Sequence, residues 1–157
     1  MIQKVEVEND KNIVQSIPLL IEMLDIRIGL ETRALKLAIP KMTEDDFVKA
    51  RNILVLYAAN VLPHGWSLLN LQFHMCLYEP CERPKLLALI EETATSFGRL
   101  SRARVSFVTG RDVPHIEHLE MLKACEARNI NLAVSLLEKH IERTQNVLIE
   151  LHEQQSC

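Results

Sequence analysis

Apolar residues recur along this chain at intervals of three and four residues, in stretches separated by short breaks. On a helix, this interval places the apolar side chains on one side. The breaks contain proline, glycine or asparagine, as in LPHG, EPCERP, TGRD and NIN. The pattern predicts six helices, over residues 16–39, 43–60, 66–78, 84–107, 112–128 and 131–154.

Residues that favour helix starts and ends lie at these boundaries. Pro18 and Pro84 suit the first turn of a helix, and Pro40 ends the first helix. Thr43 with Asp46 three residues later resembles a capping box in which Asp replaces Glu. No alternation of apolar and polar residues is long enough to predict a strand. We therefore expect an all-α, antiparallel bundle of about six helices, forming a single domain over residues 1–157.

The composition agrees with one compact helical domain. A chain of 157 residues with 48% hydrophobic content can bury a substantial core, and only four glycines and six prolines interrupt it. The formal net charge is -3 and no run of basic residues occurs. We therefore do not expect these residues to bind nucleic acid directly.

Signals for membrane insertion, secretion and disulfide bonding are missing from the sequence. The longest apolar run, Ile53–Ala59, has seven residues, whereas about 20 are needed to span a bilayer. The N-terminal residues mix charges of both signs, unlike a secretory signal. The four cysteines form no CxxC pair and are typical of reduced thiols. We expect a cytoplasmic protein.

The third predicted helix, WSLLNLQFHMCLY, is apolar nearly all round but carries one narrow polar line. Ser67, Asn70 and His74 are three and four residues apart, so their side chains stack along one side of the helix. A helix that is apolar all round belongs in the centre of a bundle. We expect its polar line to face an interior cavity.

Two further histidines lie on apolar helix faces. His118 is in line with Met121, Leu122 and Cys125, and His140 lies in the middle of the apolar stripe of the last helix. A single inward histidine is more often a hydrogen-bonded core residue than a metal ligand. Three imidazoles that converge on one cavity are most easily satisfied together by a metal ion. The spacing alone leaves both interpretations open.

Arg27 also lies on an apolar face of the first predicted helix, with Leu24 and Leu30 as neighbours. A buried guanidinium is costly unless it is paired. It can pair with Glu31 four residues later, or extend to the surface. Alternatively, it binds the carboxylate of a small acid in the cavity.

Three segments resemble the FCD domain, the C-terminal sensor of the FadR-type branch of GntR transcriptional regulators. DIRIGLETRALKLA, residues 25–38, is similar to the E-x-R-x-x-L-E-x-x-A pattern of its opening helix. NLQFH, residues 70–74, is similar to the D-x-x-F-H segment, and residues 118–141 resemble its H-x-x-I-L-x-A-I, D-x-x-x-A and H-I segments. The resemblance covers about residues 18–151.

The resemblance implies a helical bundle around a central cavity. In the metal-binding members of the family, an Asp and three His hold a divalent ion near a small carboxylate effector. By this resemblance the metal ligands here are His74, His118 and His140, and Arg27 binds the effector. Mixed imidazole and oxygen ligands suit Zn, Ni and Mn alike, so the choice among these metals stays open. Asn70 occupies the Asp position, and its neutral oxygen makes it a weak ligand.

The resemblance also implies an effector-sensing, homodimerising module that contacts DNA only through a winged helix-turn-helix domain. This chain begins almost directly at the first sensor helix, so either it is an excised domain or the protein lacks a DNA reader. Two alternatives remain. One is a metal-free structural helical module, and the other is a metalloenzyme with an open position on a three-His site. Against the enzyme, the sequence places no acid or base beside the histidines.

Overall fold

The computed structural model describes residues 2–96 and 99–157, with side chains described for residues 17–96 and 101–157. Within these residues the chain forms seven α-helices and two short 3-10 helices, and no strand. The α-helices are α1 (Ile2–Ala38), α2 (Glu44–Ala59), α3 (Pro63–Tyr78), α4 (Pro84–Ser96), α5 (Arg99–Thr109), α6 (Asp112–Glu126) and α7 (Ile130–Ser156); the 3-10 helices are η1 (Ile39–Lys41) and η2 (Glu79–Cys81). The predicted all-α class is confirmed.

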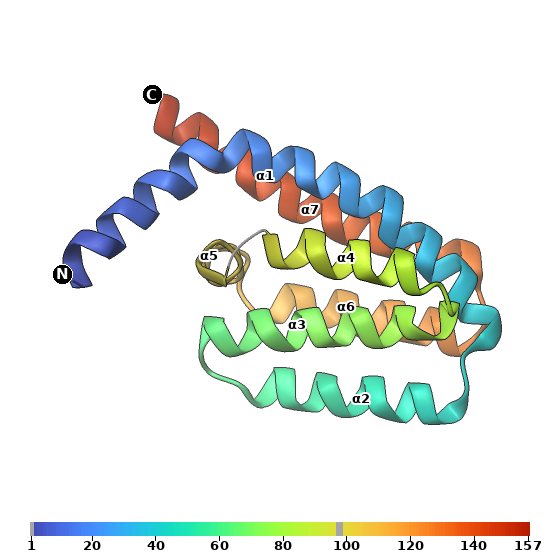
Figure 1. Ribbon diagram of the computed structural model, residues 1–157. Helices are drawn as coiled ribbons and strands as arrows, with labels where there is room; N and C mark the ends of the chain where they lie inside the picture. The colour runs from blue at the N-terminus through green and yellow to red at the C-terminus, as the bar shows by residue number, and fades with distance from the viewer. Residues whose placement is uncertain (1, 97–98) are drawn as a thin grey trace.

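Two of the predicted boundaries are wrong. The first helix begins at Ile2 and contains Pro18, rather than beginning near Ser16. Figure 1 shows α1 changing direction in its N-terminal half, as expected where proline removes a backbone hydrogen bond. The helix expected over residues 84–107 is two helices, α4 and α5, and residues 97–98 between them lie outside the described part.

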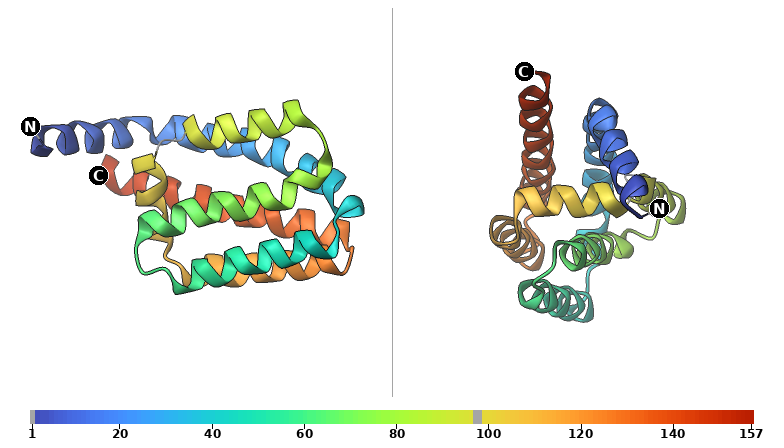
Figure 2. Two further views of the ribbon diagram at one scale, coloured as in Figure 1. Left: turned by 60° about the horizontal axis from the view of Figure 1, so that its bottom comes forward. Right: turned by 90° about the vertical axis from the view of Figure 1, so that its left-hand side faces the viewer.

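The helices pack as an antiparallel bundle crossed by one helix. α1 packs along α7, α2 packs against α3 and α6, and α6 packs against α7. α5 packs against α3 and α7. Figure 1 shows α5 end-on while the other helices are seen from the side, and the right-hand view of Figure 2 shows α5 lying across the bundle. The bundle is therefore closed at one end by a transverse helix.

The connection between η1 and α2 is fixed by local and long-range hydrogen bonds. The backbone N–H of Thr43 donates to the Asp46 carboxylate over 2.7 Å, and Asp46 N–H donates to the Thr43 hydroxyl, so the predicted capping box is confirmed. Arg128 donates to the carbonyl oxygens of Ile39 and Met42 and lies over the Phe47 ring. These contacts join the α6–α7 turn to the start of α2.

The core contains the positions that the apolar pattern assigned to helix faces, including Leu24, Phe73, Met121 and Leu137, each fully buried. Cys76, Cys81 and Cys125 are buried free thiols, and Cys157 is an exposed one. Of the helices that the structure describes, none is long and apolar enough to cross a membrane.

Candidate functional site

Three buried histidines from three helices meet in the centre of the bundle. His74 lies on α3, His118 on α6 and His140 on α7, and their exposed fractions are 2%, 0% and 7%. The ring centroids are 5.1 Å apart for His74 and His118, 5.2 Å for His74 and His140, and 4.8 Å for His118 and His140. One potential ligand atom from each ring lies within 4.8 Å of the other two. The prediction that these histidines point inward is confirmed.

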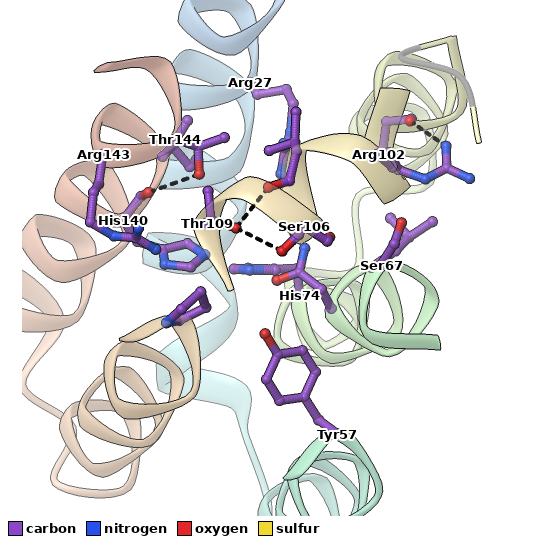
Figure 3. A pocket seen from close by; sticks show the side chains of 16 residues that line it. Arg27, Tyr57, Ser67, His74, Arg102, Ser106, Thr109, His140, Arg143 and Thr144 are labelled. Atoms are coloured by element: carbon purple, nitrogen blue, oxygen red, sulfur yellow. Dashed lines mark hydrogen bonds between the residues drawn. The ribbon is translucent and has the colours of Figure 1, made fainter. Parts of the chain in front are cut away.

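A cavity of about 80 Å³ lies beside this histidine cluster. Ser67, Asn70 and His74 all line it, so the predicted polar line of α3 does face a cavity. His140 lines the cavity too, whereas His118 packs behind it against Phe73 and Tyr57. In Figure 3 the side chains of His140, on α7, and His74, on α3, reach the cavity from different helices. The transverse helix α5 contributes Arg102, Ser106 and Thr109 to the lining.

The lining of the cavity is rich in arginine. Three arginines contribute, Arg27 from α1, Arg102 from α5 and Arg143 from α7, and the lining contains no Asp or Glu among the described residues. Serine and threonine residues and the apolar Leu71, Val105 and Ile141 also line it. Such a lining suits a small anion with an apolar part.

His74 is held by a chain of buried hydrogen bonds. Its Nδ1 lies 3.2 Å from the hydroxyl of Tyr78, and that hydroxyl donates to Glu31 Oε1 over 2.8 Å. Arg27 donates to both oxygens of Glu31, over 2.7 Å from Nε and 3.2 Å from Nη2. These four residues, Arg27, Glu31, Tyr78 and His74, are called the His74 unit below.

His140 is held by a similar but shorter arrangement. Its Nδ1 lies 2.5 Å from Oε2 of Glu117, and Arg143 donates to both oxygens of the same carboxylate. These three residues, Arg143, Glu117 and His140, are called the His140 unit below. In both units a carboxylate connects a cavity arginine with a cluster histidine, directly in one and through a tyrosine hydroxyl in the other.

The electrostatic environment keeps two imidazoles neutral. Burial holds the pKa of His74 well below its usual range, and the neighbouring His140 and the Arg27 guanidinium lower it further. Burial likewise holds the pKa of His118 well below its usual range. A neutral imidazole is the form that binds a metal.

The partners of these histidines are held in defined charge states. Burial and the Glu31 carboxylate raise the pKa of Tyr78 well above its usual range, so the hydroxyl keeps its proton. Burial would lower the pKa of Arg27, but the charge and hydrogen bonds of Glu31 outweigh it and raise the pKa. Burial would raise the pKa of Glu117, but its hydrogen bonds to His140 and Arg143 outweigh burial and lower it.

The donor set fits a divalent transition ion. Both ring nitrogens of His118 are buried and have no hydrogen-bond partner among the described residues. Leaving such groups unsatisfied costs free energy, and an ion would satisfy one of them. His74 and His140 each use Nδ1 for a partner that ends in a carboxylate. Histidines that bind metals typically have such partners, which leave the other nitrogen for the ion.

The other predicted site residues lie at the cavity. Arg27 lines it and also forms the predicted ion pair with Glu31, so the local-pair interpretation is confirmed. Asn70 lines it, and its side chain makes no hydrogen bond to any residue that the structure describes. His115, which the sequence did not predict as a site residue, is stacked on Tyr57, with ring centroids 5.8 Å apart.

Four residues at the site were not predicted from the sequence: Glu117, Arg143, Tyr78 and Arg102. The expectation that no acid lies beside the histidines is wrong, because Glu117 contacts His140. A signal was present in the sequence: Glu117 immediately precedes His118, and Arg143 follows His140 by one helical turn. Tyr78 also follows His74 by four residues on α3, a spacing that favours the contact between them. Its contact with Glu31 had no such signal, because it depends on how α1 and α3 lie against each other.

The fold and the site define an all-α domain with a buried histidine cluster beside an arginine-lined cavity. Residues 22–143 match the model of the FCD domain. The chain belongs to the FCD domain family.

Solved structures share this fold. A transcriptional regulator of the GntR family from Pseudomonas syringae pv. tomato str. DC3000 is similar with a TM-score of 0.78 and 24% identity, over 86% of this chain and 57% of that chain. E. coli McbR/YncC is similar with a TM-score of 0.72 and 18% identity, over 85% of this chain and 65% of that one. This chain therefore spans less than two thirds of either protein. No curated protein matches its sequence significantly.

Proposed function

We propose that this chain is the effector-sensing and dimerising domain of a GntR-type transcriptional regulator, with a divalent transition ion held by His74, His118 and His140. The effector would be a small organic acid bound in the cavity. One observation carries the proposal: His74 and His140 belong both to the histidine cluster and to the cavity lining. An ion on the cluster would therefore lie beside any acid in the cavity.

The charges around the cavity support an acidic effector. When bound, a divalent ion would add two positive charges at the cluster, where Asn70 supplies only a neutral oxygen. Arg27 and Arg143 are each held by a carboxylate through Nε and Nη2. A hydrogen bond between a charged arginine and a bound carboxylate contributes about 1.5 to 3 kcal/mol. Metal and acid would then favour each other's binding.

A regulator is favoured over a metalloenzyme by the state of Glu117, the carboxylate in contact with the cluster. Both of its oxygens accept hydrogen bonds from Arg143, and one also contacts His140. A carboxylate held in this way orients His140 and has a low affinity for a further proton. It is therefore poorly suited to act as a general base on a metal-bound water.

Dimerisation and DNA binding belong to the same proposal. Leu19 of α1 and Val55 and Leu56 of α2 are 56%, 67% and 58% exposed, and apolar surface of this kind is typical of interfaces. We propose a homodimer through helices flanking the cavity, with DNA contacted only by a winged helix-turn-helix domain that is not among these residues. A monomeric mass in light scattering at micromolar concentrations would contradict the dimer.

Metal titration with variants tests the site itself. We expect wild-type protein to bind Zn or Ni, more tightly in the presence of small carboxylic acids, and His74→Ala to lose the metal. Asn70→Asp restores the anionic ligand of the family pattern, so it should bind the metal more tightly and depend less on the acid. If wild-type protein binds no metal under any of these conditions while Asn70→Asp does, the natural site is metal-free. The part of the proposal that concerns the ion then fails.

A further inference from the structure

The Tyr78 hydroxyl lies between a buried carboxylate and a cluster histidine. Tyr78 is fully buried, and Glu31 is 1% exposed, so neither group exchanges its partners for water. The hydroxyl is 2.8 Å from Glu31 Oε1 and 3.2 Å from His74 Nδ1. The hydroxyl therefore has two hydrogen-bond partners and a single proton to donate.

Glu31 accepts hydrogen bonds and donates none. Both of its oxygens receive hydrogen bonds from the Arg27 guanidinium, which carries a permanent positive charge and stabilises the ionised carboxylate. The single hydrogen of the Tyr78 hydroxyl is therefore directed at Glu31. Toward His74 the hydroxyl offers only a lone pair, so Nδ1 of His74 must carry the proton that completes this hydrogen bond.

The position of that proton decides which nitrogen can bind an ion. A neutral imidazole carries one proton, so a protonated Nδ1 leaves Nε2 with its lone pair. We propose that Tyr78 is the positioning residue of the cluster: with Glu31 behind it, the hydroxyl fixes His74 in the Nδ1–H tautomer and keeps Nε2 available for an ion. The effect on metal affinity rests on the proposed function, whereas the tautomer itself does not.

Tyr57 offers a matched control for Tyr78. It is also a buried tyrosine and its ring contacts His118, with centroids 5.3 Å apart. Its hydroxyl makes no hydrogen bond to a histidine among the residues that the structure describes. Tyr57→Phe therefore removes a hydroxyl near the cluster without removing a partner of an imidazole.

The tautomer is measured on metal-free, ¹⁵N-labelled protein by long-range ¹H–¹⁵N correlation of the histidine rings, with a His74→Gln spectrum to assign the resonance. We expect His74 in wild type and Tyr57→Phe to show a protonated Nδ1 and a bare Nε2. In Tyr78→Phe, His74 should shift toward the Nε2–H form that free imidazole side chains favour. A wild-type Nε2–H form would overturn the inference even if Tyr78→Phe did not fold.

Zinc affinity, measured by chelator competition, tests the consequence for the ion. Tyr78→Phe should bind zinc about 10- to 100-fold more weakly than wild type. The zinc affinity of Tyr57→Phe should lie within about threefold of the wild-type affinity, which corresponds to a loss of at most about 0.6 kcal/mol. An unchanged tautomer in a folded Tyr78→Phe variant would refute the inference whatever the metal result. A shifted tautomer with undiminished zinc affinity would refute the positioning role. If wild-type protein shows the Nδ1–H form but binds no zinc, the proposed function fails and the tautomer assignment stands.

Discussion

In both the His74 unit and the His140 unit, a carboxylate lies between an arginine and a cluster histidine, but the two units differ in exposure to solvent. The side chains of Arg27 and Glu31 are 17% and 2% exposed, whereas those of Arg143 and Glu117 are 28% and 23% exposed. Solvent screens a partly exposed ion pair and can replace a lost partner, whereas a buried pair has no such substitute. One chemical arrangement can therefore contribute very differently to the stability of the fold, according to how far solvent reaches it.

The largest difference between the units should appear in unfolding. Glu31→Gln leaves the Arg27 guanidinium without its counter-charge in the interior, which costs about 3 to 5 kcal/mol of the free energy of unfolding. Glu117→Gln is the matched change in the more exposed unit and should cost only about 1 kcal/mol. Urea unfolding of the two variants makes the comparison. Equal losses would show that exposure does not separate the units.

A smaller difference should appear in the affinity for zinc. Glu117→Ala removes the partner of His140 Nδ1 and should weaken zinc binding by about tenfold. Glu120→Ala, which changes an exposed glutamate one turn further along α6, serves as the control and should leave the affinity unchanged. Chelator competition measures both. If Glu117→Ala binds zinc as tightly as wild type, the carboxylate orients His140 no better than water would.

The smallest expected difference is in the response to salt. A double-mutant cycle gives the coupling free energy of each arginine–carboxylate pair. Raising the ionic strength to about 1 M shortens the Debye length to about 3 Å, which should diminish the Arg143–Glu117 coupling by a few tenths of a kcal/mol. The Arg27–Glu31 coupling should not change measurably. A parallel loss in both pairs would mean that solvent reaches Glu31.

Much of the bundle and half of the site could be predicted from the sequence. The period of apolar residues fixes which side of a helix is inward, and this was enough to place His74, His118 and His140 in the interior. Local signals behaved in the same way: the capping box at Thr43 depends on residues three apart in the chain, and it forms as expected.

Contacts between helices could not be predicted in this way. Whether Glu117 reaches His140, or Tyr78 reaches Glu31, depends on how far two helices slide and rotate against each other, and periodicity within one helix does not contain that information. The break between α4 and α5 was missed for a related reason. The apolar spacing continues through residues 84–107, while the packing of α5 on α3 and α7 determines its transverse direction.

The transverse helix α5 also affects how strongly the cavity can hold anything. It supplies Arg102, Val105, Ser106 and Thr109 to the lining, yet no side chain from Ser101 to Thr109 is fully buried, and Phe107 is 72% exposed. Few buried apolar contacts mean that such an element can separate from its neighbours at a fraction of the global unfolding free energy. Any fraction of molecules with α5 displaced lowers the apparent affinity of the cavity in proportion. A ligand that contacts Arg102 therefore contributes to holding α5 in place. Its binding raises the fraction of molecules in which α5 packs against the bundle and lowers the fraction in which α5 is displaced.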